Sequence, residues 1–216
     1  VTAMQLLVDA GDEVVVVVPV WPNLPAQPAI LGANVVRVPL APDAAGAWRL
    51  DLDRLLAAVT PATRVLLLNA PNNPTGWALT RAEQQALLAH CRRTGTWIVA
   101  DEVYDRVWFG AGRAAPSFSD ISTPDDRLIV VHSFSKSFLM TGWRLGWLLL
   151  PAGHLDAVGK LIEFNSSCAP VFVQRAGLEA LAMADAFVPP LVARLRAGRD
   201  ALCAAVPPAA ARRHRP

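Results

Sequence analysis

The residues best suited to chemistry lie in a short stretch rich in hydroxyl groups. Lys136 follows Ser133 and Ser135, just after an apolar run at 128–131 that is typical of a buried strand. An ammonium group at the edge of a core costs free energy unless it is paired or reacts, and lysine forms imines with carbonyl compounds. Arg144 comes eight residues later, and a guanidinium beside hydroxyl groups suits a phosphate. The alternative is a surface lysine and a surface arginine on a serine-rich loop.

Four further candidate side chains also follow predicted strands: Trp21, Asn73, Asp101 and Tyr104. Because ligands of parallel sheets bind outside the carboxyl ends of the strands, we expect these side chains to share one site with Lys136. Each also has a simpler explanation. Asn73 is typical of a turn, Asp101 of a helix N-cap, and an aromatic ring of core packing. Taken together along successive strands, the simpler explanations require several coincidences.

The elements that must position these residues alternate along the chain. The predicted strands are 14–18, 35–38, 64–69, 97–100, 127–131 and 145–150. The predicted helices are 4–8, 26–32, 51–59, one from a Thr80-x-x-Glu83 capping box to Gly95, 154–164, 170–184 and 188–205. This alternation favours an α/β fold, a three-layer α/β/α sandwich with a mainly parallel sheet. The connection before the last strand is too short for a crossover helix, so that strand should run antiparallel.

Composition bounds the class of protein. With 216 residues, 53% hydrophobic and 18% charged, the chain can bury a substantial core. The residues from Arg194 onward include six arginines and one aspartate without interleaved aromatic rings, so we expect a basic tail but no nucleic-acid partner. Three cysteines without a CxxC pair fit a reducing cytoplasm, and four scattered histidines give no metal-ligand spacing. No apolar run is long enough for a membrane span.

Three motifs carry a resemblance to a known family. They are N-A-P-N-N-P-T-G at 69–76, A-D-E-V-Y at 100–104, and S-F-S-K at 133–136 with G-W-R-L-G at 142–146. In combination they resemble the class I/II aminotransferases, which are fold-type I enzymes that depend on pyridoxal 5'-phosphate. The resemblance runs from Val1 to about Val206 and implies the fold-type I large domain.

The resemblance also implies a role for each candidate residue. Lys136 is similar to the lysine that forms a Schiff base with the cofactor and then moves the proton at the substrate α-carbon. The remaining residues resemble the cofactor ligands: Asp101 at the ring nitrogen, Tyr104 and Asn73 at the phenolate oxygen, Trp21 stacked on the ring, and Ser133 and Arg144 at the phosphate.

By the same resemblance the chain is expected to come from an aminotransferase that moves an amino group between an amino acid and a 2-oxo acid, with a homodimeric full-length parent. Residues 1–187 would be the cofactor-binding large domain, incomplete at its N-terminus, and 188–216 the start of an interdomain helix and an irregular basic tail. The family's glycine loop would lie at or before Val1, and its carboxylate-binding arginine belongs to a C-terminal small domain. We therefore expect a chain that binds cofactor without transaminating alone.

Other functions remain open at this stage. A lyase or decarboxylase on the same fold is one alternative, because a fold does not determine the reaction. A non-catalytic domain that binds pyridoxal phosphate is another, and an inactive gene product is a third. The region 163–170 contains no arginine, which weakens an aspartate preference. Exposed sheet edges and apolar helix faces predict poor solubility of the isolated chain.

Overall fold

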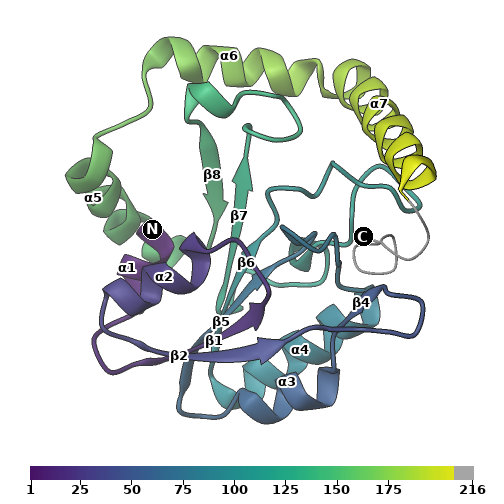
Figure 1. The fold of residues 1–216 in the computed structure, drawn as a ribbon. Coiled ribbons are helices and arrows are strands. Elements are labelled where there is room, and N and C mark those ends of the chain that lie inside the picture. Colours follow the sequence, from purple (N-terminus) through teal and green to yellow (C-terminus); the bar gives the residue numbers. More distant parts are fainter. Residues whose placement is uncertain (207–216) are drawn as a thin grey trace.

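A six-stranded sheet organises the computed structural model, which describes residues 1–206 (Figure 1). The strand order is β2-β1-β5-β6-β7-β8. The strands are β1 (Glu13–Val18), β2 (Asn34–Pro39), β5 (Thr63–Asn69), β6 (Trp97–Asp101), β7 (Leu128–Ser133) and β8 (Gly146–Leu149). All neighbours pair in parallel except β8, which runs antiparallel to β7. The predicted mainly parallel sheet with an antiparallel last strand is therefore confirmed.

A small hairpin escaped prediction. It consists of β3 (Ala41–Pro42) and β4 (Trp48–Arg49), which pair antiparallel outside the main sheet. Strands of two residues are too short to show a hydrophobic period, so the sequence pattern carries no signal for them.

Helices cover both faces of the sheet, which confirms the three-layer sandwich (Figure 1). The helices are α1 (Thr2–Leu7), α2 (Asn23–Ile30), α3 (Leu52–Ala58), α4 (Arg81–Thr94), α5 (Leu155–Ser166), α6 (Val171–Ala182) and α7 (Ala184–Ala205). Three short 3-10 turns complete the described chain: η1 (Phe118–Asp120), η2 (Thr141–Trp143) and η3 (Ala152–His154).

The valines of β1 show how the two cores form. Successive strand residues point to opposite faces, so a run of valines can be buried on both sides. Val15 and Val17 pack in the cluster that contains Leu55 of α3 and Leu87 of α4. The intervening valines at 14 and 16 pack instead in the cluster that contains Met4 of α1. Each face of the sheet is thus sealed by its own helical layer.

The start of α7 was predicted wrongly. The sequence pattern places it at residue 188, yet α7 begins at Ala184 and continues through Pro189 and Pro190, which ordinarily interrupt a helix. Val188 and Leu191 are buried, and Val188 packs on the apolar cluster of the loop after β7. Tertiary packing therefore overrides the local cost of the prolines. Part of the predicted basic tail, residues 207–216, lies outside the described residues.

Within residues 1–206 no single helix is both long and apolar enough to cross a membrane. Only α6 and α7 taken together, with a bend of 78° between them, reach that length and composition.

Candidate active site at the carboxyl edge of the sheet

Polar side chains converge where three neighbouring strands end. Asn69 is the last residue of β5 and pairs in register with Asp101, the last residue of β6. The Asn69 Nδ2 donates to the Asp101 main-chain oxygen at 3.1 Å, and its Oδ1 accepts from the Asn73 N–H at 2.8 Å. Asn69 therefore joins two strand ends to the following loop. Our sequence interpretation gave it no role, although a buried amide ending an apolar strand is an informative signal.

Lys136 lies over the ring of Tyr104, which in turn contacts Asn73. Its Nζ lies 5.3 Å from the centre of the Tyr104 ring. The Tyr104 hydroxyl accepts a hydrogen bond of 3.4 Å from Asn73 Nδ2. These three side chains come from loops after β7, β6 and β5, so the structure brings them together across three strands.

Asp101 has an altered acidity. Burial raises its pKa from 3.8 to about 6, whereas the hydrogen bond from the Val103 N–H and the charge of Lys136 act in the opposite direction. The carboxylate and the lysine are therefore electrostatically coupled. Such a carboxyl group can share a proton or an ion pair with a basic ligand atom.

The other predicted residues hold different positions on the same edge. Ser133 ends β7, and its Oγ accepts from the Ser135 N–H at 3.0 Å. The exposed Arg144 adopts a left-handed conformation with φ of 53° and donates to the Thr141 carbonyl at 2.8 Å. Trp21 follows β1 and is 52% exposed, so its ring is open to a ligand.

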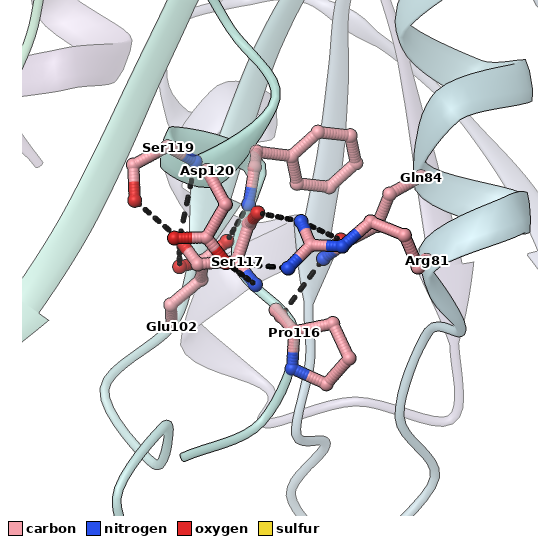
Figure 2. A network of polar contacts seen from close by, with 8 residues as sticks. Arg81, Gln84, Glu102, Pro116, Ser117, Ser119 and Asp120 are labelled. Carbon is pink, nitrogen blue, oxygen red and sulfur yellow. Dashed lines mark hydrogen bonds and ion pairs between the residues drawn. The ribbon is translucent and has the colours of Figure 1, made fainter. Parts of the chain in front are cut away.

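Glu102 was not assigned a role from the sequence, yet it is more deeply buried than its neighbour Asp101. Its side chain lies in a polar network behind the site (Figure 2). The carboxylate accepts from Ser117 Oγ at 2.5 Å and from the Phe118 N–H at 2.9 Å. Burial raises the pKa of Glu102 to about 7, although the two hydrogen bonds act to lower it. The residue thereby fastens the end of the long loop that follows β6.

Helix α4 completes this network (Figure 2). Arg81 donates to the Ser117 main-chain oxygen at 2.7 Å and to Asp120 Oδ2 at 2.5 Å. Gln84 Nε2 donates to the Pro116 carbonyl at 2.8 Å. The loop that carries Tyr104 is thus anchored at its far end to α4, and Phe118 packs in the same apolar cluster as Leu87 of that helix.

A histidine and a carboxylate lie beside the end of β7. His132 Nδ1 is 3.8 Å from Asp105 Oδ2, and its ring stacks on Trp147 with centroids 4.9 Å apart. Burial lowers the pKa of His132, and the Asp105 charge opposes that shift. Both residues line a cavity of about 530 Å³ between the loop after β6 and α7, whose lining includes Arg196 but not Lys136.

The residues present fit a phosphorylated aldehyde with a basic ring nitrogen. An amine, a partly buried carboxyl group, two hydrogen-bonding side chains and an exposed indole lie on one edge of the sheet. Among residues 1–206, two buried side-chain atoms, Asn72 Nδ2 and Ser137 Oγ, have no hydrogen-bond partner. They adjoin Asn73 and Lys136 in sequence and belong to the same two loops. No group of three or more His, Cys, Asp or Glu suited to a metal gathers within the same range.

Comparison with known proteins defines the class of molecule. A family model described as aminotransferase class I and II matches residues 1–208, and the chain belongs to this family. The resemblance stated from the three motifs is therefore confirmed.

Individual relatives agree with this assignment. The chain is 38% identical over 183 residues to an aspartate aminotransferase of Musicola paradisiaca. The alignment covers 84% of this chain and 44% of that protein. It is 35% identical over 181 residues to the arginine–pyruvate transaminase AruH of Pseudomonas aeruginosa, covering 82% of this chain and 44% of that one. The chain thus spans about half the length of the curated relatives it matches.

Solved structures show the same fold. The N-succinyldiaminopimelate aminotransferase from Mycobacterium tuberculosis superposes with a TM-score of 0.86 at 35% identity, covering 94% of this chain and 52% of that one. The aspartate aminotransferase from Thermotoga maritima gives a TM-score of 0.76 at 32% identity, covering 84% and 47%. The fold-type I architecture expected from the motifs is confirmed.

Proposed function

We propose that this chain is the pyridoxal 5'-phosphate-binding part of an aminotransferase that moves an amino group between an amino acid and a 2-oxo acid. The observation that carries the proposal is the convergence of Lys136, Tyr104 and Asn73, with Asp101 electrostatically coupled to Lys136. The family match and the relatives, which are named as amino-group transferases, support it.

Each residue performs a distinct task in this proposal. Lys136 supplies the amine that binds the cofactor aldehyde and afterwards carries the proton at the substrate α-carbon. Asp101 would hold a proton at the ring nitrogen of the cofactor, whose chemistry when bound is to accept electrons from the reacting carbon. Tyr104 and Asn73, which are hydrogen-bonded to each other, would both donate to the phenolate oxygen of the cofactor.

The remaining three candidates position the ring and the phosphate. The exposed indole of Trp21 would stack on one face of the ring and exclude water from it. The Ser133 hydroxyl and the Arg144 guanidinium bind the phosphate, for which a planar charged donor is well suited. Arg144 must release the Thr141 carbonyl or share its five donors between the two acceptors.

The wider setting is also a proposal. Relatives named for aspartate, arginine–pyruvate and N-succinyldiaminopimelate use different amino compounds, so we propose only the general substrate pair. We propose a homodimer for the complete protein, as the family resemblance implies. A cytoplasmic location is supported by Cys91, Cys168 and Cys203, which are all free. We retain residues 1–187 as the cofactor-binding unit, although that boundary falls inside α7.

Borohydride trapping tests the proposal. The chain contains two lysines, Lys136 and Lys160, and Lys160 lies exposed on α5. The wild-type chain is incubated with pyridoxal 5'-phosphate, reduced, digested and analysed by mass spectrometry. We expect the added mass on the peptide containing Lys136, its loss in Lys136→Arg, and no change in Lys160→Arg. Labelling of both lysines to the same extent would refute a specific site.

A further inference from the structure

The segment that joins β7 to β8 carries both the proposed aldehyde-binding amine and the proposed phosphate-binding guanidinium. Two of its non-glycine residues, Leu139 and Arg144, have left-handed backbones with φ of 54° and 53°. Such conformations cost free energy and persist only where surrounding contacts impose them. The relative position of Lys136 and Arg144 therefore depends on the contacts that hold this segment in shape.

Thr141 makes contacts toward both functional side chains. Its Oγ1 donates to the Ser135 main-chain oxygen at 2.9 Å, one residue before Lys136. Its own main-chain oxygen accepts from Arg144 Nη1 at 2.8 Å. One residue thus connects the backbone beside the amine with the head of the guanidinium.

The backbone hydrogen bonds of the segment show what the side chain of Thr141 adds to it. The bonds from the Leu139 N–H to the Lys136 carbonyl and from the Met140 N–H to the Phe134 carbonyl close the first half of the segment, both at 3.2 Å. The second half begins at Thr141, the first residue of η2. The Trp143 N–H donates to the Met140 carbonyl at 3.1 Å. The Thr141 hydroxyl adds a side-chain bond from this second half back to the Ser135 backbone. Thr141 is exposed, so replacing it leaves the core untouched.

We propose that Thr141 is a positioning residue of the cofactor site, whose hydroxyl sets the distance between the Lys136 amine and the Arg144 guanidinium. That distance must match a ligand with an aldehyde at one end and a phosphate at the other. The inference rests on the proposed function. It adds a residue that touches neither end of the ligand and acts through Arg144.

Comparing pyridoxal 5'-phosphate with pyridoxal, which lacks the phosphate, isolates this role. The affinity of each is measured by absorbance titration of the 216-residue chain and its variants. In Thr141→Val, which keeps the shape but loses the hydroxyl, we expect three- to tenfold weaker binding of the phosphate form, the range for one hydrogen bond. Pyridoxal affinity should change less than about twofold, since it has no phosphate for Arg144 to bind. Thr141→Ser should keep the wild-type preference.

Other outcomes overturn the inference in recognisable ways. An unchanged ratio of the two affinities in Thr141→Val, or an equal loss in Thr141→Ser, rules out a positioning hydroxyl. Equal weakening of both ligands indicates general loosening. Thr141→Ala removes the hydroxyl without adding an apolar methyl group, and if both it and Thr141→Val unfold while Thr141→Ser folds, the role is structural instead. If the wild-type chain binds neither ligand, the proposed function fails first and the inference falls with it.

Discussion

The ammonium group of Lys136 lies over the ring of Tyr104, 5.3 Å from its centre. This distance is within the range of a cation–π interaction, which at a partly buried site stabilises the charged amine. The same tyrosine accepts a hydrogen bond from Asn73 at its hydroxyl end. Tyr104 therefore has two separable functions: its ring faces the lysine, and its hydroxyl group faces the asparagine.

Replacing Tyr104 separates these two functions. Tyr104→Phe keeps the ring and loses the hydroxyl, so we expect a change in unfolding free energy below about 1 kcal/mol, because the 3.4 Å hydrogen bond is long. Cofactor affinity should fall about three- to tenfold, through the lost contact to the phenolate oxygen. Urea unfolding and absorbance titration with pyridoxal 5'-phosphate measure the two effects.

Tyr104→Leu provides the control. It removes the ring as well, so the interaction with Lys136 is lost and the affinity should fall further than in Tyr104→Phe. Equal affinities for the two variants would show that the ring beside the lysine contributes nothing.

Because the pKa of Asp101 is raised in the folded chain, we expect Asp101→Asn to increase the free energy of unfolding at neutral pH. Burial raises the pKa of Asp101 to about 6 in the folded chain, whereas an unfolded aspartate titrates near 3.8. The folded state therefore binds more protons between these values, and stability falls as the pH rises from about 4 to about 6. At pH 7.5 the cofactor-free Asp101→Asn chain should be more stable than wild type by about 1–3 kcal/mol, and near pH 4 the two should be equal.

The same variant should bind the cofactor poorly, because it lacks the charge that holds a proton on the ring nitrogen. Greater stability with weaker binding is the combination expected of a residue kept for function. Asp125→Asn, on an exposed turn, controls for the loss of one negative charge. If Asp101→Asn were less stable than wild type at pH 7.5, the ionised Asp101 could not be destabilising the folded chain.

How far the site could be predicted from the sequence depends on the kind of contact. Lys136, Asp101 and Asn73 could be placed on one edge because each follows an apolar strand, and parallel strands end together. The hydrogen bonds of Asn69 depend on which strands are neighbours, which the pattern does not fix. The contacts of Glu102 depend on a loop partner fifteen residues away. The fold follows from periodicity, whereas the supporting contacts follow from tertiary packing.

Glu102 offers a second test that depends on pH. Its pKa is about 7 in the folded chain and 4.5 as a free side chain, so wild-type stability should fall as the pH rises from about 4.5 through 7. Glu102→Gln removes this titration and can still bond to the Phe118 N–H and the Ser117 hydroxyl. We expect it to differ from wild type by less than about 1 kcal/mol near pH 4 and to be clearly the more stable protein at pH 8.5.

Glu102→Leu is the matched variant without polar atoms. It leaves the buried Phe118 N–H unpaired, whereas the Ser117 hydroxyl keeps its 2.6 Å contact with Ser119 Oγ. Relative to Glu102→Gln, we expect a loss of about 1–3 kcal/mol at both pH values in urea unfolding. If Glu102→Leu were as stable as Glu102→Gln, the hydrogen bonds shown in Figure 2 could not be what fixes the loop.

A side chain at position 146 should clash with β7, at the line where β7 and β8 pair (the β7–β8 seam). Gly146 pairs with Ser133, and a Cβ built on it would lie 2.6 Å from the main-chain oxygen of His132. Because a backbone atom cannot rotate away, Gly146→Ala must push the two strands apart. We expect a loss of about 2–4 kcal/mol in urea unfolding and weaker binding of pyridoxal 5'-phosphate, since Ser133 and Arg144 lie on either side of this seam.

Two other glycines serve as controls for Gly146→Ala. A Cβ at Gly177 would lie 2.5 Å from Leu145 Cδ2, which is a side-chain atom that can move, so Gly177→Ala should cost less. A Cβ at Gly142 meets nothing within 4 Å, and Gly142→Ala should change stability by less than about 1 kcal/mol. The expected order of cost is therefore Gly146, Gly177, Gly142. A loss of less than about 1 kcal/mol in Gly146→Ala would mean that β7 and β8 can separate easily. Strands that separate easily could not hold Ser133 and Arg144 at one phosphate.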